Sequence, residues 1–177
     1  MTDSKPIAIE PNVDQVGIVV RDVQATAKKL YELLGIGPFR VMDWPIEGID
    51  PQSTYHGEPR HYRIRLGFAR TGSTQIELIE PLDGQSIWSD FLENNGPGLH
   101  HFRIIVTKFE ETVAALEAAG LKNISSGTGA HVGSNWAYFD TAELLDGIFI
   151  ELRTRLEGAS GEGQWATPGI ETGGNKP

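Results

Sequence analysis

Residues 96–106 read GPGLHHFRIIV, an apolar run that opens on two adjacent histidines. Side chains of a strand alternate between its two faces. A strand here would place one set in the core, namely His100, Phe102, Ile104 and Val106. The opposite set would be His101, Arg103 and Ile105. The pattern predicts that His100 packs, and that His101 is either a satisfied structural residue or a ligand.

The same pattern occurs 86 residues earlier, since VDQVGIVV at 13–20 aligns with LHHFRIIV at 99–106 and places Gln15 on His101. Each copy continues into a helical pattern that stops at a glycine, at 23–35 and 109–120. Each then closes with a strand that carries a Glu-Leu pair, around Glu77 and Glu151. This repeat predicts an α+β domain of two modules, whose eight main strands form a cupped mixed sheet with helices outside.

The expected organisation has five parts. They are an N-terminal extension (1–12), module 1 (13–82), a linker (83–98), module 2 (99–155) and a Gly-rich tail (156–177) that we expect to be disordered. The linker should hold a short helix through Ile87, Trp88, Phe91 and Leu92. Module 1 also contains a long Pro/Gly-rich loop at 46–61, between strands expected at 39–44 and 61–69; loops of this length are often functional.

Composition excludes several classes of function. The chain has 177 residues, a net charge of -9 and no cysteine. The negative charge argues against nucleic acid and anionic membranes as partners, and the lack of cysteine excludes thiolate sites and disulfides. The first residues lack a basic-then-apolar signal, and no apolar run approaches the roughly 18 residues of a membrane span. We therefore expect a cytoplasmic protein.

Four polar residues are flanked by apolar ones, as expected for side chains that project into a buried cup. They are Gln15, Glu77, His101 and Glu151. Buried carboxylates need protons, cationic partners or a metal. This nitrogen and oxygen set suits Zn, Ni, Co, Mn or Fe. The alternative is that Glu77 and Glu151 pair with Arg65, Arg103 or Arg153.

Three stretches, VDQVGIVVRDV, TQIELIEPLDGQSIWSDFLENNGPGLHHFRI and GAHVGSNWAYFDTAELLDGIFIEL, together cover most of residues 13–154. They resemble the vicinal oxygen chelate superfamily, and within it the methylmalonyl-CoA epimerases. The resemblance implies two βαβββ modules around a divalent metal, with zinc slightly favoured. It places the ligands on Gln15, Glu77, His101 and Glu151, so that His101 and not His100 binds the metal. A homodimer is also expected.

Two departures separate the chain from epimerases. Those enzymes usually have histidine where this chain has Gln15, and the set Gln, Glu, His, Glu resembles eukaryotic glyoxalase I instead. The loop after Trp44-Pro45 is expanded, which favours a substrate other than an acyl-CoA. Epimerases carry a proton-transfer base in this neighbourhood, for which Asp43 is the nearest match and Glu47 the second choice.

The resemblance implies an isomerase, epimerase or lyase that acts on a small carbonyl compound through an enediolate, by metal-assisted proton transfer. Glu151 is the first candidate for the base, followed by Glu77 or Asp43. Six side chains are expected either to line the substrate cup or to fill the core: Trp44, Tyr55, His56, Tyr62, His131 and Trp136. Two alternatives remain open, an iron-dependent extradiol-type dioxygenase and a metal-free small-molecule-binding or resistance protein of the same fold.

Overall fold

The fold is built around one eight-stranded mixed sheet with the strand order β2-β5-β6-β1-β7-β10-β9-β8. The structure, a computed structural model, describes residues 13–131 and 133–155. The strands of this sheet are β1 (Val13–Val19), β2 (Arg40–Trp44), β5 (Arg63–Thr71), β6 (Thr74–Asp83), β7 (Gly98–Val106), β8 (Asn123–Thr128), β9 (Asn135–Phe139) and β10 (Phe149–Thr154). The remaining elements are α1 (Val23–Leu34), α2 (Ile87–Asn95), α3 (Phe109–Ala118) and a small hairpin of β3 (Thr54–Tyr55) and β4 (Glu58–Pro59). The extensions expected at 1–12 and 156–177 lie outside the described residues.

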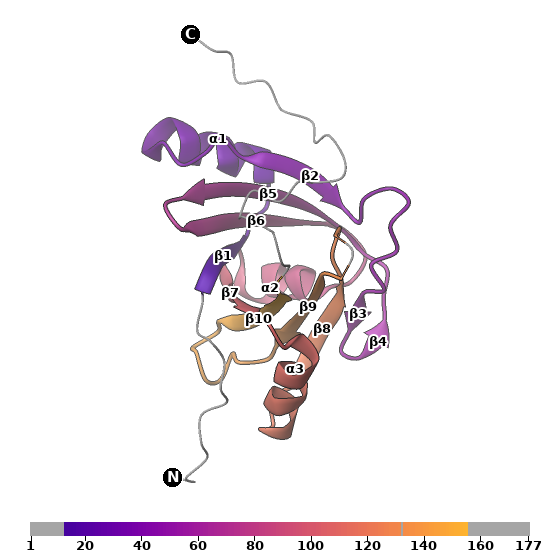
Figure 1. The fold of residues 1–177 in the computed structure, drawn as a ribbon. Helices are drawn as coiled ribbons and strands as arrows, with labels where there is room; N and C mark the ends of the chain where they lie inside the picture. Colours follow the sequence, from indigo (N-terminus) through magenta and orange to yellow (C-terminus); the bar gives the residue numbers. More distant parts are fainter. Residues whose placement is uncertain (1–12, 132, 156–177) are drawn as a thin grey trace.

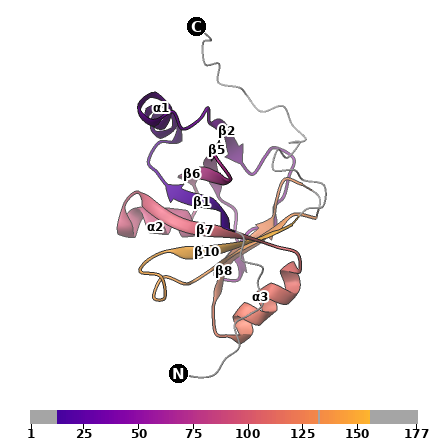
Figure 2. The same ribbon diagram turned by 60° about the vertical axis from the view of Figure 1, so that its left-hand side comes forward.

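The two halves of the sheet follow the same plan. In the first half β1 pairs with β6 in parallel, and in the second β7 pairs with β10 in parallel. The antiparallel pairing of β1 with β7 joins the halves at the centre of the sheet. The sheet curls around its inner face, and α1 and α3 lie outside it (Figures 1 and 2). The prediction of an eight-stranded cupped mixed sheet is confirmed, and the predicted helices of the two modules, α1 and α3, lie outside it.

Helix α1 shows why the repeat folds in this way. Asp22 caps its first turn by accepting a hydrogen bond from the N–H of Ala25, and Gly35 ends it with φ of 67°. Val23 and Ala27 are buried against the outer face of the first half. The described residues bury only the N-terminal part of this helix, and Tyr31 in its last turn is 56% exposed. Helix α3 buries Phe109 and Leu116 against the second half in the same manner.

The inner face of the sheet holds the largest apolar cluster. Its buried members are Val19, Trp44, Tyr62, Ile64, Ile79, Ile87, Trp88, Phe91, Ile124, Trp136 and Tyr138. Both halves and α2 contribute to it, and Trp88 of α2 packs edge-on against Tyr62 and Tyr138. The linker helix is therefore confirmed, and it fills the interior of the curl. Burial of this much apolar surface is the main stabilising term of the fold.

Residues 45–62, here called the bridging segment, connect the two edges of the sheet. The segment leaves β2 at one edge and hydrogen bonds to β8 at the other, where the N–H of His56 donates to the carbonyl of Ile124 (2.8 Å). The N–H of Thr128 likewise donates to the carbonyl of Pro51 (2.8 Å). The long loop predicted from sequence is thus an ordered element with its own hairpin, and it covers the open edge of β8 (Figure 1).

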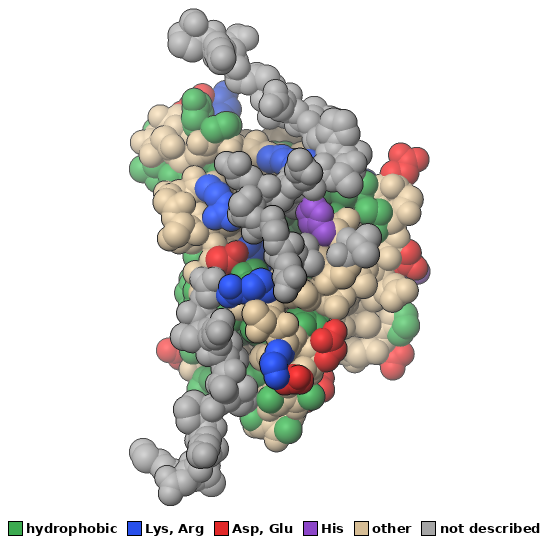
Figure 3. All heavy atoms as spheres, in the orientation of Figure 1, with side chains coloured by type: hydrophobic (Ala, Val, Ile, Leu, Met, Phe, Trp, Pro, Cys, Tyr) green, Lys and Arg blue, Asp and Glu red, His purple; other side chains and the backbone are tan. Residues whose placement is uncertain are grey.

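On the part of the face that Figure 3 colours, basic and acidic side chains are interspersed and neither sign forms a continuous patch. Among the described residues, no helix combines the length and the apolar character that crossing a membrane requires.

Candidate metal centre

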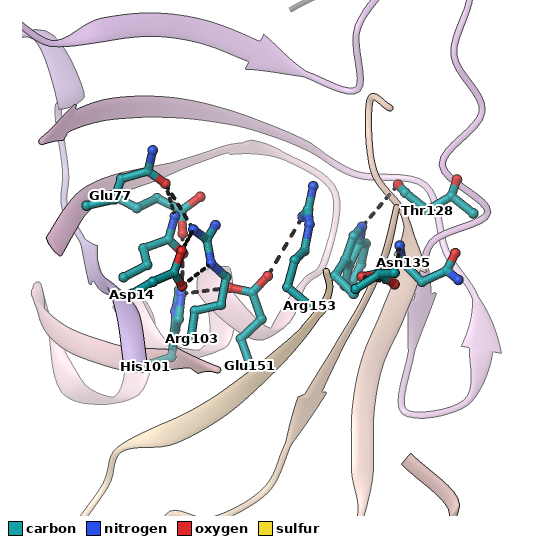
Figure 4. A network of polar contacts seen from close by, with 12 residues as sticks. Asp14, Glu77, His101, Arg103, Thr128, Asn135, Glu151 and Arg153 are labelled. Atoms are coloured by element: carbon teal, nitrogen blue, oxygen red, sulfur yellow. Dashed lines mark hydrogen bonds and ion pairs between the residues drawn. The ribbon is translucent and has the colours of Figure 1, made fainter. Parts of the chain in front are cut away.

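Four neighbouring strands at the middle of the sheet each contribute one polar side chain to a common point. The side chains are Gln15 on β1, Glu77 on β6, His101 on β7 and Glu151 on β10. The Nε2 atom of His101 lies 3.3 Å from Oε2 of Glu77 and 3.2 Å from Oε2 of Glu151. The Oε1 atom of Gln15 lies 3.4 Å from the same nitrogen. All four side chains are buried, and Figure 4 shows the central part of this network.

Strand register explains the convergence. Gly17 is paired with Glu77 on one side and with His101 on the other. Gly17 has no side chain, and a Cβ atom at this position would collide with the imidazole of His101. The glycine therefore provides the space into which the histidine projects. A glycine inside a strand pattern is the sequence signal for such a close approach.

The prediction that His100 faces away from the site is wrong. The ladder between β1 and β7 shifts register after Gly17–His101, so that the next pair is Ile18–Leu99 and His100 has no partner. This bulge breaks the alternation of side chains, which rests on a regular ladder. His100 instead packs on the inner side, stacked on Phe149, and its Nδ1 atom lies 3.0 Å from Nδ1 of His101.

The carboxylates determine the charge of His101. Burial disfavours a charged imidazole, but the hydrogen bonds and charges of Glu151 and Glu77 outweigh burial and raise the pKa of His101 to about 9. Burial alone would raise the pKa of Glu151, and the contact with His101 reverses this and lowers it. Glu151 is therefore an ionised carboxylate at neutral pH, held next to a cation.

The donor set fits a divalent cation. The ligand atoms of Glu77, His101 and Glu151 lie within 4.8 Å of one another. With its Oε1 toward the site, the Gln15 amide places a third oxygen 3.2 Å from Oε2 of both carboxylates, and a cation would relieve this crowding of acceptors. With the amide turned over, its nitrogen donates to both carboxylates and its oxygen accepts from Nη1 of Arg103 at 2.9 Å. Gln15 can thus serve the site as a ligand or, without an ion, as a donor.

The alternative of arginine partners for Glu77 and Glu151 receives limited support among the described residues. Arg103 forms a bidentate pair with Asp14 at 2.9 and 2.7 Å, and Arg65 pairs with Asp43. Arg153 makes an ion pair with Oε1 of Glu151, at 3.8 Å. The pairing of Arg103 with Asp14, a residue adjacent to Gln15, was not predicted from sequence.

The two acidic residues proposed as epimerase-like bases lie elsewhere. On β2, Met42 and Trp44 join the inner cluster and Val41 joins the cluster under α1, so alternation places Asp43 on the outer face. Asp43 binds Arg65 there, with 2.7 Å between Oδ1 and Nε. Glu47 is exposed in the bridging segment.

The six residues expected in the cup or the core separate into two groups. Trp44, Tyr62 and Trp136 belong to the inner apolar cluster. The other three lie in turns or in the hairpin. The hydroxyl of Tyr55 donates to Asp90 (2.6 Å), His56 is exposed at the hairpin turn, and the carbonyl of His131 accepts from the N–H of Ser134. None of the six belongs to the Glu77, His101 and Glu151 group.

Comparison with known proteins agrees with this architecture. A family model of the glyoxalase/bleomycin resistance protein/dioxygenase superfamily matches residues 14–139. The fold resembles a hypothetical protein from Bacillus halodurans (TM-score 0.65, 24% identity, 85% of this chain and 98% of that one). It also resembles methylmalonyl-CoA epimerase from Mycobacterium tuberculosis (TM-score 0.62, 21% identity, 86% and 93%).

An uncharacterized protein of Bacillus subtilis is 29% identical over 90 residues, which are 51% of this chain and 64% of that protein. The chain thus spans less than two thirds of this relative's length. The structural likenesses are below 25% identity and show the fold alone. Because the family model spans most of the chain, from β1 through β9, the protein belongs to the glyoxalase/bleomycin resistance protein/dioxygenase superfamily.

Proposed function

We propose that the protein is a metal-dependent isomerase, epimerase or lyase that moves a proton next to the carbonyl group of a small molecule. The observation that carries the proposal is the buried group of Glu77, His101 and Glu151, whose ligand atoms lie within 4.8 Å of one another. In the metal-free chain a protonated His101 compensates only part of the charge of the two buried carboxylates, and a divalent cation would complete the group.

The ion would be held by these three side chains and by the amide oxygen of Gln15. A nitrogen and oxygen set of this kind suits Zn, Ni, Co, Mn or Fe, and zinc remains slightly favoured. When bound, such an ion supplies Lewis acidity that polarises a carbonyl oxygen and stabilises the negative charge of an enediolate.

Glu151 is the first candidate for the base. Its carboxylate is ionised, since contact with His101 lowers its pKa below the usual value despite burial. An ionised carboxylate beside the reacting carbon can accept a proton and return it. Glu77 is the second candidate because its Oε2 atom lies at the same point. Asp43 is not part of the proposal, since it lies on the outer face.

The destination of the proton separates the possible reactions. Removal of the proton by one carboxylate and delivery of a second proton to the opposite side of the same carbon by the other carboxyl group would give epimerisation, for which Glu77 and Glu151 supply the two groups. Its delivery to a neighbouring carbon would give an isomerase or glyoxalase-like outcome. The likeness to methylmalonyl-CoA epimerase supports the epimerase type at the level of the fold.

The two alternatives receive less support. An extradiol-type iron site needs two histidines and one carboxylate, whereas the group found among the described residues has one histidine and two carboxylates. A metal-free binding protein has no need for the ligand set, yet all four side chains converge here.

The test compares Glu151→Gln with Asp43→Asn, a matched removal of one carboxylate on the opposite face. Metal content is measured first, and candidate 2-oxoacids, acyl thioesters and α-hydroxyketones are then incubated in D₂O. We expect deuterium uptake next to the carbonyl, a 10²- to 10⁴-fold lower turnover in Glu151→Gln on the order expected for a general base, and little change in Asp43→Asn. Oxygen consumption, or full activity of both Glu151→Gln and Glu77→Gln, would rule out proton transfer by these residues.

A further inference from the structure

Arg153 lies on the same strand and the same face as Glu151. Leu152, between them, packs in the cluster under α3, so alternation turns Glu151 and Arg153 to the inner side. Figure 4 shows the Arg153 side chain rising from β10 beside Glu151. Its side chain keeps 24% of its surface exposed and is therefore accessible to a small molecule.

The guanidinium of Arg153 has unused hydrogen-bonding capacity. Its ion pair with Oε1 of Glu151, at 3.8 Å, is too long for a hydrogen bond, and it donates none to the rest of the described chain. Arg103 and Arg65 differ, because each binds its own carboxylate in a bidentate pair, at Asp14 and Asp43 respectively. Five N–H donors that remain largely unused beside a metal centre are available to a ligand.

The charges of the site leave Arg153 without compensation once a divalent ion is bound. Asp14 cancels Arg103, and Glu77 with Glu151 cancels the two positive charges of the ion. Arg153 then contributes one positive charge in a largely buried setting, where an uncompensated charge is unfavourable. One negative charge on the ligand would restore neutrality.

The backbone opposite the guanidinium leaves room for this side chain. A Cβ atom at Gly129 would collide with Nη2 of Arg153 and would lie 2.6 Å from Oγ of Ser134. The glycine therefore allows Arg153 to extend along the end of β8 instead of folding away from the inner face.

We infer that Arg153 binds a carboxylate of the substrate, and that the substrates are therefore small anionic carbonyl compounds. The inference rests on the proposed function, since it places the carbonyl at the metal centre. A guanidinium matches a carboxylate through two parallel hydrogen bonds, which a neutral amide or ester does not reproduce. Because Arg153 adjoins Glu151, the carboxylate should be attached close to the reacting carbonyl.

The test measures binding of pyruvate and of its neutral isostere pyruvamide to the full chain loaded with Co²⁺, by calorimetry and by the visible spectrum of the ion. The variants are Arg153→Gln and Arg153→Lys, with Arg63→Gln as control. Arg63 makes an ion pair of the same kind, 3.7 Å from Asp43, but is 59% exposed and remote from the metal ligands.

In the unmodified chain we expect pyruvate to bind more tightly than pyruvamide. Arg153→Gln should weaken pyruvate on the order of 10- to 100-fold and leave pyruvamide nearly unchanged. Arg153→Lys should keep part of the preference because it keeps the charge, and Arg63→Gln should keep all of it. Equal affinity for the two probes, an unchanged preference in Arg153→Gln, or no measurable pyruvate binding would overturn the inference.

Failure of this inference is distinguishable from failure of the proposed function. If the preference for pyruvate depends on Arg153 but no carbonyl compound exchanges hydrogen with D₂O, the anion site stands and proton transfer is ruled out. If pyruvate exchanges hydrogen with D₂O equally fast in the unmodified chain and in Arg153→Gln, proton transfer is retained and the anion site is ruled out.

Discussion

His101 directs one ring nitrogen to the carboxylates and the other to a second histidine. The two Nδ1 atoms are 3.0 Å apart, so one must donate and the other accept. Burial, together with the charge of His101, lowers the pKa of His100 well below the usual value, which makes His100 neutral. His100 is then the acceptor, and its fully buried Nε2–H has no partner among the described residues. A hydrogen bond of this kind fixes the orientation of a ligand imidazole.

The first prediction follows from this contact. His101→Ala should abolish stoichiometric metal binding, as measured by elemental analysis. His100→Phe keeps the ring but loses the acceptor, and should weaken the metal affinity on the order of 10- to 100-fold in a chelator competition. His100→Asn restores an acceptor near Nδ1 and should recover most of the affinity. If His100→Phe binds metal as tightly as the unmodified chain, the contact does not support the ligand.

The second prediction concerns pH. The imidazole of His101 has its pKa raised from 6.5 to about 9 in the metal-free chain, so an ion must displace a proton. Metal affinity should rise about tenfold per pH unit below pH 9 and level off above it. The raised pKa also stabilises the metal-free fold below about pH 6.5, and this contribution is lost as the pH rises through about 9. Chelator competition and thermal melts across this range check both statements, and a flat affinity profile would contradict the first.

At the scale of elements, the antiparallel pairing of β1 with β7 leaves room for the His101 ring only because Gly17 lies opposite it. Gly17→Ala would place a methyl group in the space of the His101 ring, so the third prediction is a large loss of metal affinity with a destabilisation of about 1–3 kcal/mol. Gly98→Ala on β7 is the control, because the nearest atom to its new methyl group would be Cε1 of Phe91 at 4.0 Å. Metal titration and urea unfolding report the two effects, and equal behaviour of the variants would show that Gly17 is not a steric requirement.

The elements differ in how far the sequence predicts them. The 86-residue repeat predicts the paired halves, because a duplicated apolar pattern imposes the same strand and helix order twice. Alternation places Gln15, Glu77 and Glu151 on the inner face, since the parallel ladders of β1 with β6 and of β7 with β10 keep their register at these positions. It fails at His100, because a bulge depends on which residues of β1 lie opposite and not on β7 alone.

Whole-molecule contacts are the part that the sequence does not predict. The bridging segment is bound to β8, about 70 residues further along the chain, through Thr54 and Ser126. No local pattern encodes such a partner. Likewise, the side on which Asp43 lies depends on the register of β2 against β5. The homodimer and the cytoplasmic location remain predictions.

The fourth prediction concerns the link between the two edges. The Oγ1 atom of Thr54 accepts a hydrogen bond from the N–H of Ser126 at 2.9 Å. Thr54→Val keeps the shape and removes the acceptor, and should lower the free energy of unfolding by about 1–3 kcal/mol. Thr54→Ser keeps the hydroxyl and should lose less. Urea unfolding measures the difference, and a Thr54→Val variant as stable as Thr54→Ser would show that this contact adds nothing to stability.

The bridging segment also bears on how a duplicated chain recognises itself. Two halves with the same order of strands and helices can undergo domain swapping, in which a half of one molecule pairs with the complementary half of another. The segment belongs to the first half alone and its partner strand to the second, so the two halves are no longer equivalent. Within a single chain these hydrogen bonds form at the high effective concentration of tethered groups. The insertion therefore favours the union of each first half with its own second half.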